Sequence, residues 1–482
     1  MANRLDPPAD AVRAFGAAAL DAAVRYYESL PDIRIMPETT AAAIRAEIDE
    51  PLPQVGAGFD RVLEIVDRTI LPLSRHNGHP RFFGYVASPG SAVAAFADML
   101  ASVLNTNVTA WRSAPAPTEV EHVALRWIRE MLGYPADAGG LFVSGGSMAN
   151  FAGLAAARSA RAPANVTKSG MHSVGRAMRI YVSEEGHSSI KKAAAMLGFG
   201  EENVQFIKTD ERFRIDLADL ERRIETDFAG GFLPVCLVAN AGTTATGAFD
   251  PIGEMAEIAR KYNLWLHVDG AYGGFSALAP SARPNFSAIA AADSIALDPH
   301  KWLYSSLGCG CVLYKDPEAA RAAFCHDAEY TRVVGWERDE AFAFWDYGPE
   351  LSRRFRALAV WMLIKYAGAD LLGESIERNI ACAKHLECLV RASADFEMLA
   401  PVELSVFCFR YAPAGFQGNL DDLNERILFE LQRRGSSYLS NARLGGRFAL
   451  RGCVLNYRTT EHDMEILLDD VREATRGIQC FQ

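Results

Sequence analysis

The sequence predicts an α/β protein whose central sheet is mostly parallel. Short apolar runs rich in β-branched residues recur along the chain, among them GLFV (140–143), RIYV (179–182) and VCLVAN (235–240). Amphipathic helical stretches separate these runs. Such alternation is typical of a parallel sheet covered by helices. In sheets of this kind, ligands bind at the carboxyl ends of the strands.

The chain has 482 residues, which is too long for one ordinary core, and its pattern changes twice. Residues 1–82 show helical periodicity with little core of their own, so we expect an N-terminal arm that packs on another part or another subunit. Residues 83–365 carry the strand–helix alternation of a large domain. Residues 366–482 combine long amphipathic helices with short strands, which predicts a small C-terminal α+β domain.

The composition argues against several classes of function. The net charge is −11 and no basic block occurs, which argues against nucleic-acid and anionic membrane partners. The N-terminus has acidic residues and prolines where a secretory signal needs an apolar core. The longest apolar stretch is interrupted by Asp98 and is expected to form a helix rather than a membrane span. The nine cysteines are scattered and interpreted as reduced thiols. We therefore expect a soluble cytoplasmic protein without a bound metal.

Two predicted strands end in groups suited to a charged ligand. LFVSGGSMAN (141–150) runs from a strand through glycines and Ser147 into a helix, whose N-terminus can bind a phosphate. Capping of the helix by Ser147 is an equally simple interpretation. Asp269 ends another apolar strand, where a buried carboxylate needs a partner. That partner could be a turn or a protonated heterocyclic nitrogen.

His187, Thr244 and Lys301 follow three further apolar segments. A lone histidine at such a junction is more often structural. A lysine next to an aromatic residue such as Trp302 often packs its aliphatic chain on apolar surface and keeps its ammonium group in water. The alternative is a partly desolvated amine that forms a Schiff base with a carbonyl cofactor. The order of glycine turn, histidine, threonine loop, aspartate and lysine suits a cofactor with a phosphate, a pyridine nitrogen and a carbonyl.

Taken together, these motifs resemble those of a known family. SGGSMAN, GHSS, NAGTTATGAFDPI, HVDGAYGG and DPHKW, with flanking segments over nearly the whole chain, are similar to group II pyridoxal-phosphate-dependent amino-acid decarboxylases. That group includes aromatic L-amino-acid, histidine and glutamate decarboxylases. The resemblance implies the fold-type I, aspartate-aminotransferase-like fold. It also implies pyridoxal 5′-phosphate as cofactor and a homodimer with active sites at the subunit interface.

The resemblance assigns a role to each cofactor-binding position. Lys301 would form the Schiff base, and Asp269 would pair with the pyridinium nitrogen, which keeps the ring an electron sink. His187 would lie over the ring and contact the substrate. The remaining cofactor-binding positions are Gly146, Ser147 and His300 at the phosphate and Thr244 near the phenolic oxygen.

One position departs from the family pattern. Several members have asparagine where this chain has Asp298. A carboxylate beside the phosphate is unfavourable unless it is paired or turned away. We therefore extend a phosphate role to His300 and not to Asp298.

Four further residues are candidates for the substrate side. Tyr330 matches a tyrosine on a loop that covers the neighbouring site, and it would protonate the carbon that loses carbon dioxide. Tyr85 would contact the substrate side chain and Ser88 its carboxylate. Ser352 aligns with a position where serine accompanies phenolic and glycine indolic substrates. These matches favour decarboxylation of tyrosine or dopa.

Other reactions remain open at this point. The chain could decarboxylate glutamate, aspartate or histidine, or it could be a decarboxylation-dependent aldehyde synthase, although Tyr330 argues against that. Transamination is another fold-type I reaction, for which Arg451 could hold an α-carboxylate. A non-catalytic scaffold would be expected to lose Lys301 or Asp269, and both are present.

Overall fold

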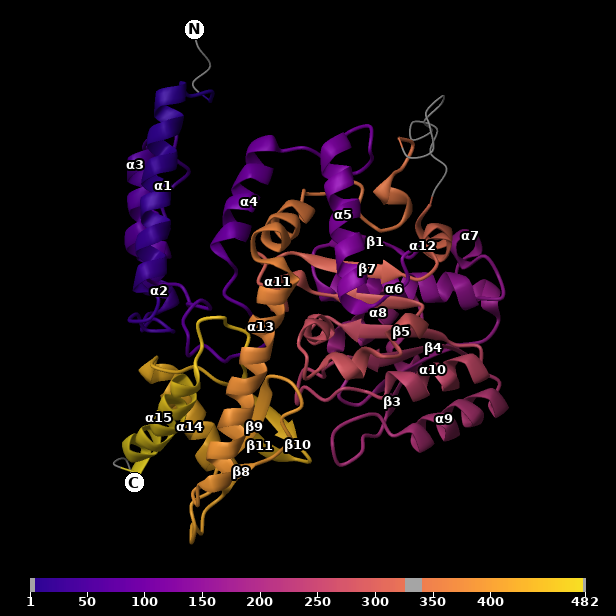
Figure 1. Cartoon of the computed structure of the whole chain (residues 1–482). Helices are drawn as coiled ribbons and strands as arrows, with labels where there is room; N and C mark the ends of the chain where they lie inside the picture. The colour runs from indigo at the N-terminus through magenta and orange to yellow at the C-terminus, as the bar shows by residue number, and fades with distance from the viewer. Residues whose placement is uncertain (1–4, 326–339, 480–482) are drawn as a thin grey trace.

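The computed structural model describes residues 5–325 and 340–479. Helices at the N-terminus stand beside the body of the molecule (Figure 1). These helices are α1 (Ala9–Ser29), α2 (Ala41–Ile48) and α3 (Phe59–Ile65), which a π-helical turn at Val66–Ile70 extends. None of the described helices combines the length and apolar character needed to cross a membrane.

A seven-stranded sheet forms the centre of the large domain, in the order β1-β7-β6-β5-β4-β2-β3. Only β7 runs antiparallel to its neighbours, so the predicted mostly parallel sheet is confirmed. The strands are β1 (Gly139–Val143), β2 (Met178–Ser183), β3 (Val204–Ile207), β4 (Leu233–Asn240), β5 (Trp265–Gly270), β6 (Ser294–Leu297) and β7 (Gly310–Tyr314). Every residue of β5, β6 and β7 is buried, as expected for strands covered on both faces.

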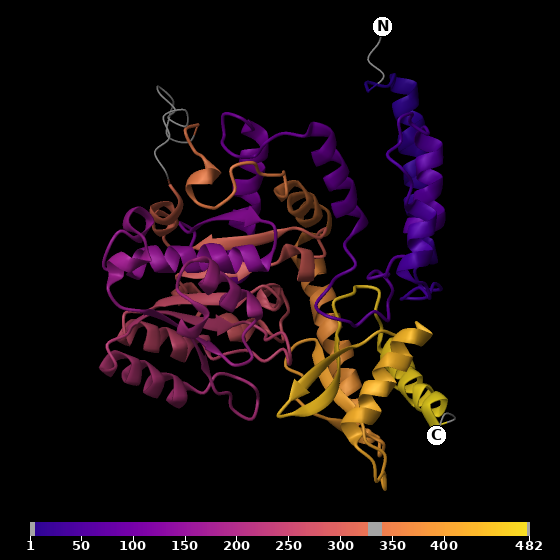
Figure 2. The same cartoon turned by 180° about the vertical axis from the view of Figure 1, so that it is seen from behind.

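Helices follow the strands as the sequence pattern predicted. The helices of this part are α4 (Ala92–Leu104), α5 (Pro115–Leu132), α6 (Gly146–Arg161), α7 (Val166–Ser169), α8 (Ser188–Met196), α9 (Leu217–Ala229), α10 (Ile252–Lys261), α11 (Pro299–Trp302) and α12 (Pro317–Phe324). The connections from β1 to α6, from β5 to the 3₁₀ helix η4 (Gly274–Leu278) and from β6 to α11 all leave the same edge of the sheet, because β1, β5 and β6 point in one direction. That edge faces the small domain (Figure 2).

The C-terminal part is a four-stranded antiparallel sheet packed with helices, in the strand order β10-β11-β9-β8. Its elements are α13 (Ala357–Ala392), β8 (Phe396–Met398), β9 (Val406–Tyr411), α14 (Leu420–Arg434), β10 (Ser440–Leu444), β11 (Arg447–Cys453) and α15 (Glu461–Gln479). The predicted boundary between residues 365 and 366 falls inside α13, near Gly368, whose φ of 70° interrupts the helix. The exact domain limits remain a prediction.

A buried ion pair ties the large domain to the segment that precedes α13. The side chains of Glu121 and Arg353 are fully buried and lie 2.5 Å apart. Arg353 also donates to the carbonyls of Val108 and Phe142, and the Phe142 N–H donates to Glu121. The guanidinium thus joins α5, β1 and two loops.

Replacing Glu121 with alanine is expected to lower the free energy of unfolding by about 3–5 kcal/mol, because Arg353 would remain buried without its counter-charge. Urea unfolding measures the change. Glu130→Ala is the control, since Glu130 lies exposed on the same helix and its pairing with Arg126 contributes less than about 1 kcal/mol. Equal losses in the two variants would contradict a stabilising role for the buried pair.

Candidate active site

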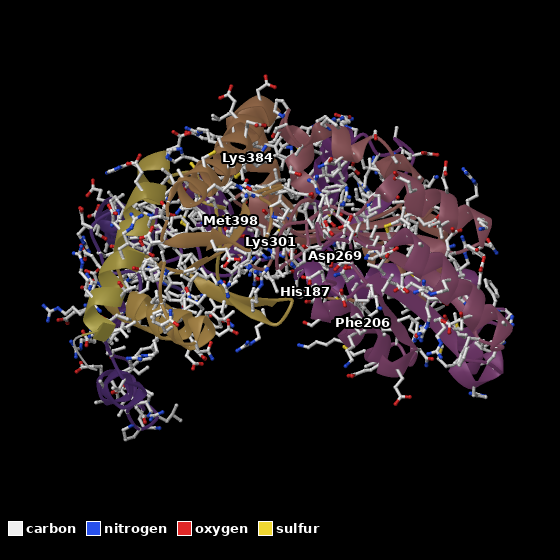
Figure 3. All side chains as sticks on the ribbon, turned by 90° about the horizontal axis from the view of Figure 1, so that it is seen from below. His187, Phe206, Asp269, Lys301, Lys384 and Met398 are labelled. Atoms are coloured by element: carbon white, nitrogen blue, oxygen red, sulfur yellow. The ribbon has the colours of Figure 1, made fainter. Side chains whose placement is uncertain are left out.

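A cavity of about 860 Å³ opens where the sheet edge meets the small domain. Its wall combines the starts of α6 and α8, the end of β5, α11 and residues of β10 and β11. In Figure 3, Lys301, Asp269 and His187 lie close together between the two parts. Eight residues predicted from the sequence line this cavity: Tyr85, Gly146, Ser147, His187, Thr244, Asp269, His300 and Lys301.

Lys301 lies on α11, the short helix that follows β6. The neighbouring Trp302 is fully buried, stacks on Tyr272 with ring centres 5.0 Å apart, and donates to Asn379 at 3.1 Å. This packing fixes α11 against the core. Lys301 Nζ lies 2.9 Å from the buried carboxylate of Asp298. The lysine is therefore held inside the cavity by an ion pair rather than directed into bulk solvent.

Asp269 stands at the end of β5 with both carboxylate oxygens engaged. Oδ2 accepts from Asn150 Nδ2 at 2.9 Å, and Oδ1 accepts from the Ala271 N–H at 3.1 Å. These two donors hold the carboxylate in one orientation. An ionised carboxylate in this position can pair with a cationic group of a ligand in the cavity.

Asn150 belongs to a buried chain of hydrogen bonds that sequence reasoning missed. Its Nδ2 also donates to Ser189 Oγ at 2.9 Å, and its Oδ1 lies 2.9 Å from His267 Nε2. His267 Nδ1 lies 2.7 Å from Ser294 Oγ, which also accepts from Trp265 Nε1 at 2.8 Å. Burial lowers the pKa of His267 to about 4, so the ring is neutral. The sequence signal that could have identified Asn150 is a polar residue among the alanines of the helix that follows the glycine turn.

His187 caps the N-terminus of α8 with its ring. Nδ1 accepts from the Ser189 N–H at 3.2 Å and lies 2.8 Å from Ser189 Oγ. Because Nδ1 is an acceptor in this arrangement, Nε2 carries the ring proton. Ser189 therefore links the orientation of His187 to Asn150 and, through it, to Asp269.

The glycine turn between β1 and α6 presents the start of a 16-residue helix to the cavity. The first N–H groups of a helix are unpaired by its own geometry and favour an anion. A Cβ on Gly146 would lie 2.6 Å from Asp298 Oδ2 and 2.8 Å from Ala271 Cβ, so no larger residue fits there. His300 stands beside the turn and donates through Nδ1 to the Cys309 carbonyl at 2.8 Å.

Arg451 joins two wall segments rather than facing a ligand. Its guanidinium donates to the Thr244 carbonyl at 2.5 and 3.1 Å and to the Tyr85 carbonyl at 2.8 Å. Tyr85 has φ of 60°, which is unusual for a non-glycine residue and fixes the bend of its loop. Its exposed ring stacks with Arg75, whose guanidinium carbon lies 4.9 Å from the ring centre. These contacts hold Tyr85 and Thr244 at the cavity rim.

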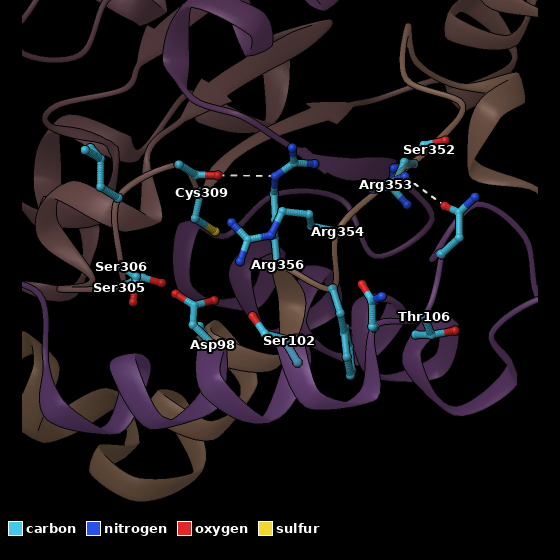
Figure 4. A pocket seen from close by; sticks show the side chains of 17 residues that line it. Asp98, Ser102, Thr106, Ser305, Ser306, Cys309, Ser352, Arg353, Arg354 and Arg356 are labelled. Carbon is cyan, nitrogen blue, oxygen red and sulfur yellow. Dashed lines mark hydrogen bonds between the residues drawn. The ribbon is translucent and has the colours of Figure 1, made fainter. Parts of the chain in front are cut away.

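Two substrate-side candidates, Ser88 and Ser352, do not line this cavity. The Ser88 hydroxyl donates to the His300 carbonyl at 2.8 Å. Ser352 lines a second cavity of about 310 Å³ beside α4, together with Asp98, Arg354 and Arg356 (Figure 4). Tyr330 lies outside the described residues. The predicted substrate contacts of all three remain predictions.

Comparison with known proteins identifies the family. The pyridoxal-dependent decarboxylase conserved domain matches residues 42–412. The chain belongs to the pyridoxal-dependent decarboxylase family. An aromatic-L-amino-acid decarboxylase of Bacillus atrophaeus is 32% identical over 466 residues, covering 96% of this chain and 95% of that protein.

Solved structures agree with this membership. A crystal structure of Oryza sativa TDC with PLP and tryptamine matches with a TM-score of 0.92 and 29% identity, covering 99% of this chain and 100% of that one. Rhodiola rosea 4-hydroxyphenylacetaldehyde synthase matches with a TM-score of 0.87 and 28% identity, covering 99% and 100%. The predicted fold-type I architecture is thereby confirmed.

This decarboxylase is a carboxy-lyase that uses pyridoxal 5′-phosphate, as the sequence motifs predicted. The residues of the cavity fit that group. Lys301 offers an amine, Asp269 a carboxylate and α6 a free helix N-terminus, all lining one space. Within the described ranges, no group of His, Cys, Asp or Glu side chains is arranged to hold a metal ion.

Proposed function

We propose that this enzyme decarboxylates an aromatic L-amino acid, with tyrosine or dopa as the favoured substrates, and releases carbon dioxide and the amine. The observation that carries the proposal is the convergence of Lys301, Asp269 and His187 on one cavity. The relative from Bacillus atrophaeus, named an aromatic-L-amino-acid decarboxylase, supports the substrate class. The predicted cytoplasmic location is part of the same proposal.

When bound, pyridoxal phosphate supplies a carbonyl that condenses with an amine and a ring that accepts an electron pair. Lys301 would hold the carbonyl carbon until a substrate amine replaces it. Asp269, oriented by its two hydrogen-bond donors, would pair with the protonated ring nitrogen. His187 would cover the ring, held in one orientation by Ser189.

The phosphate side and the ring edge complete the proposed cofactor site. Gly146 and Ser147 would bind the phosphate at the start of α6, where a helix N-terminus attracts an anion. His300 would add a contact through Nε2, because Nδ1 is bonded to the Cys309 carbonyl. Thr244, whose carbonyl is fixed by Arg451, would lie near the phenolic oxygen.

The charges of the cavity wall favour a substrate without an acidic side chain. Glu184 and Glu185 both line the cavity, and burial raises the pKa of Glu185. Arg451 is engaged by backbone carbonyls, and Arg443 pairs with Asp421 at 3.3 Å. A carboxylate on the substrate side chain would meet these glutamates, and among the described residues neither lining arginine is free to offset them. This arrangement also weakens the case for an aminotransferase that uses Arg451.

The predicted homodimer is supported by apolar surface on α4. Phe96, Met99, Leu100 and Val103 are exposed along this helix, Val103 by 78% of its surface, and Leu307 nearby is 87% exposed. A contiguous apolar surface of this kind is unusual for a monomer and marks interaction sites. Sedimentation of the purified enzyme measures the assembly, and a monomer at micromolar concentration would contradict this part of the proposal.

Ser352 lies outside the main cavity of its own chain, so contact with a substrate requires the site of a second copy. Ser352→Gly is expected to raise kcat/KM for tryptophan relative to tyrosine by about tenfold, since removing the hydroxyl removes a hydrogen bond to a phenol. Steady-state kinetics with both amino acids measure the ratio. Ser306→Gly, in the same second cavity, is the control, and an equal change in it would contradict the assignment.

Tyr330→Phe is expected to lower amine formation and to produce aldehyde and ammonia with consumption of dioxygen. Without the phenol, the carbon that loses carbon dioxide is not protonated promptly and is exposed to oxidation. Chromatography of amine and aldehyde, with an oxygen electrode, measures the partition. A variant that makes only amine at the normal rate would contradict a proton-donor role for Tyr330.

The proposed function is tested by carbon dioxide release and amine formation on a panel of tyrosine, dopa, phenylalanine, tryptophan, histidine, glutamate and aspartate. Stoichiometric amine from an aromatic member is the expected result. Carbon dioxide from an acidic member alone would overturn the substrate class. Aldehyde from the unaltered enzyme would favour the aldehyde synthase, the alternative supported by the Rhodiola rosea structure. Consumption of a keto acid without carbon dioxide would indicate transamination.

A further inference from the structure

Asp298 is a buried carboxylate between β6 and α11 that no assigned role explains. Its side chain is 3% exposed, and Oδ2 lies 2.9 Å from Lys301 Nζ. The other oxygen, Oδ1, accepts no hydrogen bond from any residue that the structure describes. A buried carboxylate oxygen without a donor is costly. Among the described residues, Oδ2 thus has a charged partner and Oδ1 has no donor.

The surroundings of Asp298 contain little other charge. His300 Nδ1 lies 3.6 Å from Oδ1, but its hydrogen points to the Cys309 carbonyl at 2.8 Å. Burial raises the pKa of the Cys309 thiol, which stays uncharged. On the remaining side, Oδ2 abuts the first turn of α6, where a Cβ on Gly146 would lie 2.6 Å away. Asp298 thus stands between the lysine amine and the helix start that favours a phosphate.

This position creates two problems that a single proton solves. The Lys301 ammonium, paired with a carboxylate, cannot attack a carbonyl until it loses a proton. A phosphate at the start of α6 would also face the Asp298 carboxylate, and a nearby like charge disfavours the ionised form of a carboxyl group. Transfer of one proton from Lys301 to Asp298 frees the amine and removes the like charge.

We propose that Asp298 accepts the proton that Lys301 loses when its nitrogen bonds to the cofactor's carbonyl carbon, and that the resulting carboxylic acid faces the phosphate. The proton moves between two atoms already 2.9 Å apart. The freed amine lone pair forms the C–N bond, and the two hydrogens left on nitrogen depart with the carbonyl oxygen as water. Asp298 keeps the transferred proton and can donate it to a phosphate oxygen. This role rests on Lys301 being the residue that binds the carbonyl.

The test compares the cofactor-free enzyme with Asp298→Asn, which keeps the shape of the side chain and removes its basicity. Schiff-base formation is followed by stopped-flow absorbance with pyridoxal phosphate and with pyridoxal, which lacks the phosphate. The variant is expected to react about 10²-fold more slowly with both aldehydes at neutral pH. Its rate should rise with pH, as bulk solvent deprotonates Lys301 instead. Inorganic phosphate should bind the variant about tenfold more tightly, because the opposing carboxylate is absent.

An unchanged rate with both aldehydes would overturn the proposal. Slowing confined to pyridoxal phosphate, or faster reaction with it, would also overturn it, because Asp298 would then act on the phosphate alone. Glu221→Gln removes a carboxylate outside the cavity, which pairs with Lys261 at 2.7 Å, and is expected to leave the rate unchanged. Lys301→Ala should form no Schiff base in the cavity, and if it does, the assignment of the lysine fails rather than the role of Asp298. Circular dichroism and melting temperature check the fold of each variant.

Discussion

Lys301→Ala is expected to lower decarboxylation by at least about 10⁴-fold, since loss of the nucleophile in other covalent enzymes costs up to about 10⁶-fold. The visible absorbance of the Schiff base should disappear with the activity. The alanine leaves the cavity wall intact, because α11 is anchored through Trp302 rather than through the lysine. The lost activity should therefore reflect the missing amine rather than a rearranged cavity wall.

Two comparisons make this result specific to Lys301. Lys191→Ala removes a surface lysine that pairs with Glu201 at 2.8 Å, and it should leave both absorbance and activity unchanged. Lys301→Ala also leaves Asp298 buried without a counter-ion. The double variant with Asp298→Asn should recover part of any lost thermal stability while remaining inactive. An active Lys301→Ala enzyme with normal absorbance would contradict the proposed site.

Asp269→Asn is expected to lower kcat by about 10²–10³-fold, the usual cost of removing one electrostatic contact to the charge that develops in a reaction. The amide keeps the size of the carboxylate but carries no charge, so it cannot hold a proton on the ring nitrogen. The cofactor should still bind through Lys301. The expected change is therefore in kcat, with Schiff-base absorbance retained.

Asp269→Glu provides the matched comparison, because it retains the charge and moves it by one methylene. We expect this variant to keep more activity than the asparagine variant. Asn150→Ala tests the orientation of Asp269 separately from its charge. This variant removes the hydrogen-bond donor to Asp269 Oδ2 and leaves the carboxylate in place. If Asp269→Asn retained activity within about threefold, the carboxylate would not be the partner of the ring nitrogen.

Much of the site could be predicted because it lies at strand ends. The carboxyl ends of parallel strands meet at one edge of a sheet, so Asp269 at the end of β5 and Lys301 after β6 lie near each other. Glycines before α6 add a helix N-terminus to the same edge. The α/β class therefore followed from local patterns, whereas the fold type and pyridoxal phosphate followed from the resemblance of the motifs to a known family.

The remainder depends on tertiary contacts that no local pattern contains. Asn150 and His267 are separated by 117 positions, and their bond arises only when α6 packs on β5. Ser88 is only three residues after Tyr85, which lines the cavity, yet its hydroxyl donates to the His300 carbonyl. Ser352 follows the motif order but lines a different cavity, because the buried Arg353 next to it fixes that loop elsewhere. The antiparallel direction of β7 likewise results from the short return after α11.

The chain of hydrogen bonds around Asn150 also determines whether protons can be transferred through it to Asp269. Trp265 donates to Ser294 and neutral His267 to Asn150, so Ser294 Oγ donates in turn to His267 Nδ1. The Asn150 amide donates through Nδ2 to both Asp269 and Ser189, and a carboxamide does not exchange its protons as a carboxyl or imidazole does.

The buried network therefore orients the side chain of Asp269 but does not conduct protons to it. No proton reaches Asp269 from the interior of the protein by this route. The pH dependence of the rate should then reflect groups that face the cavity, and no inflection should arise from the titration of His267.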